Sequence, residues 1–259
     1  MNASSHGDVI RREFTIQADA YAATASLADP ARVQLLIDAV KPAPDARALE
    51  VACGPGHVAL VMAPHVGEMV GIDLTDAPLV IAETRRRERG IANLRFETGD
   101  ATALRFPDGS FEIAVCRFAF HHFDEPERVL AEMVRIVRPG GTVAVHDLIV
   151  SEIAERGAYQ NRFENLRDRS HTRAFPLSGL LALFAAANLD VEHVSTEALT
   201  PQVEPWMERA QTPPDRAAEA RALIEADERD DLSGTRPYRV DGQLHFTQRT
   251  VIVVGRKFN

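Results

Sequence analysis

The pattern of hydrophobic and polar positions predicts two helices at the start of the chain. From Gly7 to Leu27 the apolar residues recur at intervals of three and four, as they do on one face of an amphipathic helix. A second helix is expected from Pro30 to about Ala39. Asp29 is its natural N-cap, and Pro30 suits the first helical position because its missing N–H costs nothing there.

After a connector over Lys41–Asp45, short apolar runs alternate with helical segments. Strands that alternate with helices predict a parallel sheet covered on both faces. The Arg138–Gly141 turn, RPGG, is expected to end a helix and start a strand. The expected strands are Ala48–Ala52, Met69–Leu74, Leu94–Glu97, Phe111–Phe118 and Thr142–Ile149, and the expected helices are His57–Ala63, Pro78–Arg89 and Pro126–Val137.

The remaining third of the chain adds helices and two further strands. Ser151–Ser170 is expected to be a charged helix and Pro176–Asn188 a more apolar one. The alternating stretches Val191–Glu197 and Gln243–Val254 are expected to complete the sheet, with the polar helical segment Glu204–Arg229 between them. The predicted fold is therefore α/β, with a Rossmann-like, mostly parallel sheet of seven strands and helices on both faces.

Composition narrows the class of protein. The net charge of −9 argues against a general nucleic-acid or anionic-membrane binder, because such partners favour a basic surface. Cys53 and Cys116 have no nearby cysteine partner, so neither a disulfide framework nor a CxxC metal site is indicated. Without a signal segment or an apolar run of about 20 residues, we expect a cytoplasmic protein with no membrane insertion.

A glycine hinge follows the first expected strand of the core. Cys53-Gly54-Pro55-Gly56 leads into a helix, which places free backbone N–H groups where a ligand could approach. A plain strand-to-helix turn would look the same. The lysine and hydroxyl of a phosphate-binding loop are missing, whereas Ala59 is a permitted third residue of a dinucleotide fingerprint, so a nicotinamide cofactor stays open.

Acidic residues follow the next two expected strands. Asp73 lies 17 residues beyond Gly56 (73 − 56), where an acid reaches the ribose hydroxyls of an adenosine ligand, and Asp100 follows the third strand. An aspartate that only ties down its own loop is the competing interpretation. Three successive strand ends then carry polar groups on one rim of the sheet, which is where such sheets bind ligands.

The segments LEVACGPGHVA, GIDLT, GDATALRFPDGSFEIAVCRFAFHHFDEP and EMVRIVRPGGTVAVHD resemble those of class I S-adenosylmethionine-dependent methyltransferases of the ubiquinone/menaquinone-biosynthesis type. The resemblance covers about Ala46 to Leu148 and implies S-adenosyl-L-methionine as cofactor. It implies C- or O-methylation of a small-molecule acceptor. Two positions depart from the pattern, because Ala52 stands where the family often has glycine and Glu50 where it often has aspartate.

The same resemblance assigns roles to individual residues. Asp73 would bind the ribose hydroxyls, Leu74 would pack on adenine, and Asp100 and Ala101 would read the adenine amino edge. Arg117 would lie beside the amino-acid end of the cofactor, and Tyr21 of the N-terminal lid helix would close over it. The residues facing the methionine and ribose parts would be Glu50 and the Ala52–Gly56 loop, with Gly54 and Gly56 as its glycines.

A general base is needed only when the methyl acceptor carries a proton. His121 and His122 follow the fourth strand of the core, and because neighbours on an extended segment point to opposite sides, only one is expected to face the acceptor. His122 is the preferred candidate, and a histidine that only packs or bonds a loop is the alternative. A metal site from His121, His122 and Asp147 lacks the usual ligand spacing, so no metal is expected.

Residues outside the core have two interpretations. The segment from Asn161 to Phe175 carries Arg162, Arg167, Arg169, His171 and Arg173 around Phe163, and it is either a solvated helix face or a polar substrate lid. His146 and Asp147 are expected to shape the acceptor site. Trp206 and Met207 are either ordinary packing or a cap on the acceptor.

Residues 1–259 are interpreted as one methyltransferase domain. Lid helices occupy 1–40, the cofactor-binding core 46–149, and a substrate lid, a helical insertion and the final strands 150–259. A homodimer is a possible assembly. Two alternatives stay open: a protein of this fold that binds S-adenosylmethionine without transferring a methyl group, and a nicotinamide-dependent oxidoreductase.

Overall fold

The computed structural model describes residues 5–24 and 28–258. Its centre is a sheet in the order β3-β2-β1-β4-β5-β10-β7, with a short strand β6 paired to β5. The strands are β1 Arg47–Val51, β2 Glu68–Asp73, β3 Leu94–Thr98, β4 Phe111–Arg117, β5 Val137–Val150, β6 Phe175–Pro176, β7 Leu189–Leu199, β8 Tyr238–Val240, β9 Gln243–His245 and β10 Gln248–Lys257. β1 to β5 are parallel, whereas β10 runs antiparallel to both β5 and β7. The predicted mostly parallel, Rossmann-like sheet is confirmed.

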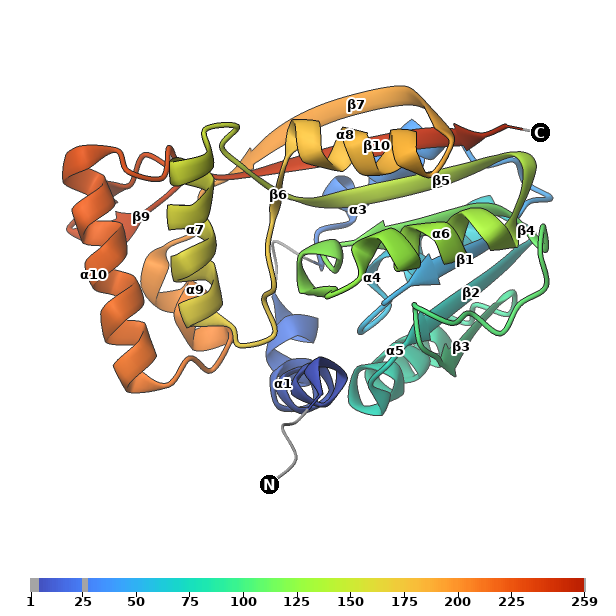
Figure 1. Ribbon diagram of the computed structural model, residues 1–259. Helices are drawn as coiled ribbons and strands as arrows, with labels where there is room; N and C mark the ends of the chain where they lie inside the picture. Colours follow the sequence, from blue (N-terminus) through green and yellow to red (C-terminus); the bar gives the residue numbers. More distant parts are fainter. Residues whose placement is uncertain (1–4, 25–27, 259) are drawn as a thin grey trace.

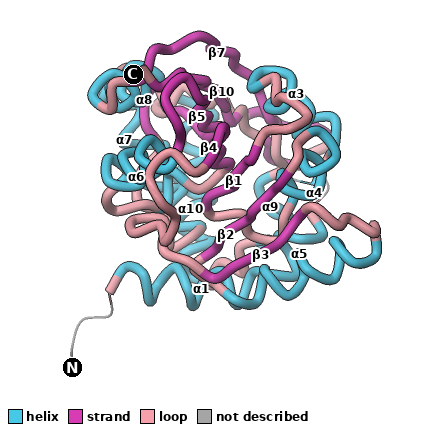
Figure 2. The backbone as a smooth tube through the Cα atoms, turned by 90° about the vertical axis from the view of Figure 1, so that its right-hand side faces the viewer, coloured by secondary structure: helices cyan, strands magenta, loops and turns pink. Residues whose placement is uncertain are grey.

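Helices cover both faces of this sheet (Figures 1 and 2). Alternate residues of each central strand face opposite sides, so Leu49 packs in a core with α6 and α8 while Ala48 packs in another with α3 and α4. The helices are α1 His6–Ala23, α3 Pro30–Val40, α4 His57–Met62, α5 Asp76–Glu88, α6 Pro126–Ile136, α7 Ala154–Arg167, α8 Leu177–Ala186, α9 Val203–Arg209 and α10 Pro214–Asp230, with 3-10 turns η1 Ala63–His65 and η2 Phe120–His122.

Both N-terminal helices begin at side-chain caps, of which Asp29 was predicted and Ser5 was not. The Ser5 side chain accepts the Asp8 N–H in a capping box at the start of α1, and Asp29 accepts the Ala31 N–H at the start of α3. α1 ends at Ala23, and the last part of the helix predicted to Leu27 falls on residues 25–27, outside the described residues. In both views α1 lies alongside α5, at one end of the sheet (Figures 1 and 2).

Two strand predictions need correction. The single strand expected over Gln243–Val254 is two: β9 turns back on β8 as a hairpin, and β10 then joins the sheet. The RPGG turn lies within the assigned span of β5, where the register against β4 jumps from Phe111 opposite Val137 to Ile113 opposite Thr142. Its Gly140 has a φ of +75°, so the chain bends there before regular pairing resumes.

Part of the chain after β5 forms a separate small core beside the sheet. It consists of α7, α9, α10 and β9, whereas α8, β7 and β10 pack in or on the sheet. α7, α9 and α10 lie together at one side of the molecule (Figure 1). Their apolar residues and those of β9 pack around the fully buried Trp206, with Phe163 and Phe246 edge-on to its ring at 6.2 and 4.9 Å between centroids. Of the two interpretations of Trp206 and Met207, packing in this core is the one that the structure supports.

Candidate active site

A cavity of about 350 Å³ opens at the carboxyl ends of the parallel strands, between the strand-end loops and α1. It gathers most of the residues named from the sequence, although they are spread over a hundred positions. The predicted site residues that line it are Tyr21, Glu50, Ala52, Gly54, Asp73, Leu74, Asp100, Ala101, Arg117 and His122. Gly56 and His121 do not line it.

The loop after β1 is tied to the end of β2. The Gly54 N–H donates to Asp73 Oδ2 at 2.8 Å, and Thr75 N–H donates to Oδ1 at 2.9 Å. Burial raises the pKa of Asp73, and these N–H donors oppose the rise. Gly54 has a φ of +51°, and a Cβ built on it would meet no atom within 4 Å, so its open side faces the cavity. Asp73 thus shapes the loop as well as bordering the cavity.

Gly56 supports the loop from behind. It stands at the start of α4 with a φ of +77°, and an added Cβ would lie 2.9 Å from Cζ of Phe96 and 3.1 Å from Cβ of Ala82. Its glycine is therefore required by backbone conformation and by close packing. Ala52, at the position where related sequences often carry glycine, has a φ of +54°, which is unfavourable for a residue with a Cβ.

Two buried ionisable side chains face the cavity: Glu50 from β1 and Arg117 from β4. Glu50 accepts the Ala59 N–H at 2.8 Å, and burial raises its pKa to about 8 against the opposing effects of that bond and of Arg117. Burial also lowers the pKa of Arg117 to about 10, although Glu50 favours its charge. Arg117 Nε donates to His146 Nδ1 at 3.3 Å, and its guanidinium stacks 4.5 Å from the Phe118 ring. A positively charged ligand group beside Glu50 would favour the carboxylate form.

The two adjacent histidines lie in different surroundings. His121 Nδ1 lies 2.5 Å from Asp147 Oδ1, and the charge of Asp147 outweighs burial to raise the pKa of His121. His122 lines the cavity, where burial and the neighbouring His121 lower its pKa to about 3. Its Nδ1 lies 3.0 Å from Ser170 Oγ, and its buried Nε2 has no hydrogen-bond partner within residues 5–24 and 28–258. His122 is thus the neutral histidine of the pair.

The first helix supplies an apolar wall that the sequence indicated only as a lid. Ile10, Phe14 and Ala18 line the cavity together with Tyr21, and the Phe14 ring is edge-on to the His122 ring at 5.0 Å. Both ends of α1 are fastened: His6 Nε2 lies 2.7 Å from the His122 carbonyl oxygen, and Arg85 donates to the Ala22 carbonyl at 2.8 Å. The spacing of its apolar residues was the available signal for this wall.

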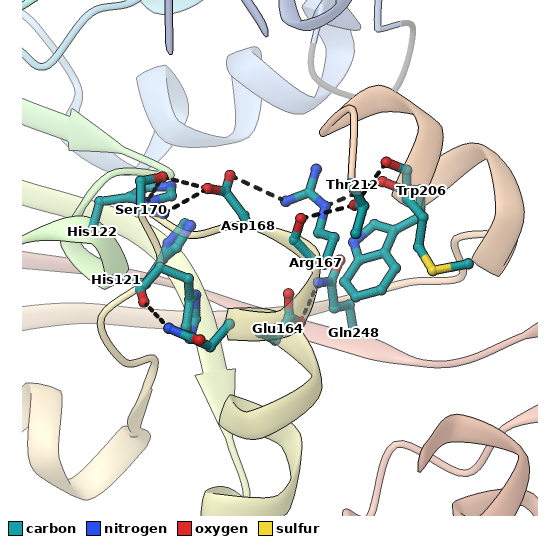
Figure 3. A network of polar contacts seen from close by, with 12 residues as sticks. His121, His122, Glu164, Arg167, Asp168, Ser170, Trp206, Thr212 and Gln248 are labelled. Carbon is teal, nitrogen blue, oxygen red and sulfur yellow. Dashed lines mark hydrogen bonds and ion pairs between the residues drawn. The ribbon is translucent and has the colours of Figure 1, made fainter. Parts of the chain in front are cut away.

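The arginine-rich segment from Asn161 to Phe175 does not line the cavity. Arg167 is buried, with its guanidinium 5.1 Å from the Trp206 ring and its Nε–H donated to the Trp206 carbonyl at 3.1 Å. A solvated face is therefore the wrong interpretation for Arg167. Behind His122 this segment contributes Asp168 and Ser170 (Figure 3), neither of which the sequence indicated. His146 and Asp147 are likewise buried outside the cavity lining.

Two further findings concern the described part of the chain. No group of three or more His, Cys, Asp or Glu side chains in residues 5–24 and 28–258 is arranged to hold a metal ion. None of the helices in those ranges combines the length and the apolar character needed to span a bilayer.

Comparison of the sequence and the fold with known proteins identifies the family of this chain. Residues 49–145 match the family model described as a methyltransferase domain. The uncharacterized methyltransferase YcgJ of Bacillus subtilis is 32% identical over 203 residues, which is 78% of this chain and 80% of that protein. Its crystal structure superimposes with a TM-score of 0.83 at 28% identity, covering 88% of this chain and 98% of that one.

Two more distant relatives are named for specific methyl-transfer activities. The demethylmenaquinone methyltransferase of Thermus thermophilus is 38% identical over 101 residues, 38% of this chain and 46% of that protein. A structure of geranyl diphosphate methyltransferase in complex with S-adenosylmethionine has a TM-score of 0.66 at 18% identity, covers 88% of this chain and 85% of that one, and shares the fold. The resemblance deduced from the sequence is confirmed: this chain belongs to the S-adenosylmethionine-dependent methyltransferases.

Proposed function

We propose that this protein transfers a methyl group from S-adenosylmethionine to carbon or oxygen of a small, largely apolar acceptor, with His122 as the base. One observation carries the proposal. A single cavity brings the polar strand-end groups expected to bind the cofactor together with an apolar wall from α1 and with His122, whose buried Nε2 has no hydrogen-bond partner within residues 5–24 and 28–258.

The residues present fit the cofactor. Its sulfonium supplies a methyl group that is already activated for displacement, so the protein mainly has to align the acceptor and exclude water. Gly54 leaves open space beside Asp73, whose carboxylate would accept hydrogen bonds from the ribose hydroxyls. Glu50 offers a buried carboxyl to a cationic group, and Asp100 and Ala101 border the same cavity after β3.

The acceptor side of the cavity is aromatic and aliphatic. Phe14, Ile10 and Phe123 line it beside His122, so the acceptor is expected to have an apolar body. A neutral imidazole nitrogen accepts a proton from a phenol, an enol or an activated C–H group. With S-adenosylmethionine bound, His122 Nε2 would take the proton of the acceptor atom as that atom bonds to the methyl carbon, and the electron pair of the broken S–C bond would stay on the sulfur of S-adenosylhomocysteine.

Cofactor binding is measured by calorimetry with S-adenosylhomocysteine. Asp73→Asn keeps the shape of the side chain but removes its charge, and should weaken binding by about 1–3 kcal/mol, or roughly fivefold to 150-fold. Asp108→Asn, at an exposed aspartate outside the cavity, is the matched control and should leave affinity unchanged. Absence of binding to the wild type would overturn the proposal.

Methyl transfer is tested by screening phenols, enols and quinols for formation of S-adenosylhomocysteine. His122→Asn places an amide nitrogen near the position of Nδ1 and has no atom at Nε2. It should reduce turnover by about 10²–10⁴-fold while leaving cofactor affinity intact. Binding without turnover of any acceptor would instead favour a cofactor-binding protein that transfers no methyl group.

A further inference from the structure

A buried network of polar groups links His122 to Ser170 and Asp168 (Figure 3). Ser170 Oγ lies 3.0 Å from His122 Nδ1 and 2.6 Å from Asp168 Oδ1, which also accepts the Ser170 N–H at 2.9 Å. The exposed fractions are 3% for His122, 0% for Ser170 and 2% for Asp168. Asp168 and Ser170 come from the turn after α7 and do not line the cavity.

The position of each proton in this hydrogen-bonded network follows from the chemistry of its three side chains. Burial disfavours a charge on Asp168, but the Arg167 guanidinium and the two hydrogen bonds from Ser170 favour the charged form, and the pKa of Asp168 is lowered, so it is a carboxylate. A carboxylate only accepts hydrogen bonds, and a serine hydroxyl has one proton to give. The Ser170 O–H therefore donates to Asp168, and the Ser170 oxygen accepts a hydrogen bond from the histidine ring.

The hydrogen bond that the Ser170 oxygen accepts fixes which ring nitrogen of His122 is protonated. A neutral imidazole carries one ring proton, and here it must be on Nδ1, the nitrogen that faces Ser170. Nε2 is then the unprotonated nitrogen. The opposite tautomer would set the Nδ1 lone pair against the Ser170 oxygen and leave a buried N–H on Nε2 without an acceptor within residues 5–24 and 28–258.

We propose that Asp168 and Ser170 are positioning residues: they hold the His122 proton on Nδ1, so that Nε2 is kept as the proton acceptor for the methyl acceptor. The inference rests on the proposed role of His122 as the base. Asp168 and Ser170 act through the histidine ring and touch neither the acceptor nor the cofactor.

The surroundings keep this arrangement rigid. Arg167 lies 3.9 Å from the second Asp168 oxygen, and is itself held by the ring and carbonyl of Trp206 in the small C-terminal core. On the other side, the edge of the Phe14 ring packs on His122. His122 is thus contacted by two separate elements. The turn after α7 fixes the position of its ring proton, and Phe14 of α1 fixes the plane of its ring.

The tautomer is measured directly, without an acceptor. In the full chain labelled with ¹⁵N-histidine, long-range ¹H–¹⁵N spectra separate protonated from unprotonated ring nitrogens. The signals of His122 are identified by their loss in His122→Asn and, should that variant not fold, in His122→Gln. We expect a protonated Nδ1 and an unprotonated Nε2 in the wild type, and mixed tautomers in Ser170→Ala. A proton on Nε2 in the wild type overturns the inference.

Turnover of an acceptor found by screening supplies the second measurement. Ser170→Ala should lower kcat about 10- to 100-fold, a part of what a general base contributes, with little change in KM or in affinity for S-adenosylhomocysteine. Ser170→Thr restores the hydroxyl and should recover most of kcat. An unchanged kcat in Ser170→Ala, with the cofactor bound normally, refutes the positioning role. Failure of the wild type to bind the cofactor refutes the proposed function instead.

Discussion

Gly56 provides the sharpest test of how the loop after β1 is built. Changing it to alanine adds a Cβ that meets the Phe96 ring at 2.9 Å and Ala82 at 3.1 Å, in a residue with a φ of +77°. Gly242 has the same φ of +77°, in the turn between β8 and β9, but no atom lies within 4 Å of its added Cβ. The pair therefore separates the cost of backbone conformation from the cost of packing.

The magnitude follows from these two contributions. A left-handed conformation costs an L-residue about 1–2 kcal/mol, and loss of glycine's freedom in the unfolded chain returns about 0.5–1 kcal/mol. These values are common to both variants. Overpacking against Phe96 and Ala82 costs about 1–3 kcal/mol and applies only to Gly56. We expect the free energy of unfolding to fall by about 1–3 kcal/mol more in Gly56→Ala than in Gly242→Ala.

Urea unfolding followed by circular dichroism measures this difference, provided that both variants keep the wild-type m-value. Gly54→Ala completes the experiment, because its added Cβ points into the cavity and meets no protein atom. It should unfold like Gly242→Ala but bind S-adenosylhomocysteine at least about tenfold more weakly. Equal losses of stability in Gly56→Ala and Gly242→Ala would show that the packing reasoning is wrong.

Three other predictions follow from single residues. Ala52→Gly relieves a φ of +54° and should change the free energy of unfolding by less than about 1 kcal/mol in either direction. The same change at Ala48, buried within β1, should cost more in the same urea assay. The pKa of Glu50 is raised to about 8, so Glu50 is protonated at pH 7 before a ligand binds. Binding of a cationic ligand group beside Glu50 should make Glu50 release its proton, and the ligand should therefore bind more tightly as pH rises toward 8. Calorimetry in buffers of different ionisation enthalpy should detect the release in the wild type, and an equal release in Glu50→Gln would contradict it. Trp206→Ala should cost about 3–5 kcal/mol by thermal unfolding, and a loss below about 1 kcal/mol would mean that the small core is loosely packed.

The gathering of the strand-end residues around one cavity was predictable because its signals are local. Gly54, Asp73 and Asp100 each follow an apolar strand within a few residues, and a parallel sheet brings such strand ends to one edge whatever the details of packing. A local pattern also identified Asp29 as the cap of the helix that starts at Pro30. These features depend on chain neighbours, which a sequence shows directly.

The partners of His122 could not be predicted in the same way. Ser170 is 48 positions away, and the contact exists because α7 packs on α10 in a small core beside the sheet. The charged composition of that segment indicated solvent exposure, whereas Arg167 and Glu164 are buried and satisfied by Trp206 and Gln248. One missed element did carry a signal: Asp241-Gly242 is a turn pair typical of two-residue hairpins, and both residues have a positive φ.

The place of β10 between β5 and β7 has a consequence for synthesis of the chain. Ile149 of β5 pairs with Arg249 of β10, 100 positions later (249 − 149), so the outer edge of β5 lacks this long partner until β10 has been made. At a synthesis rate of about 5–20 residues per second, the outer edge of β5 stays unpaired with β10 for roughly 5–20 s. Closure of the sheet by β10, after the cofactor-binding strands have paired, is therefore expected to limit the rate of folding.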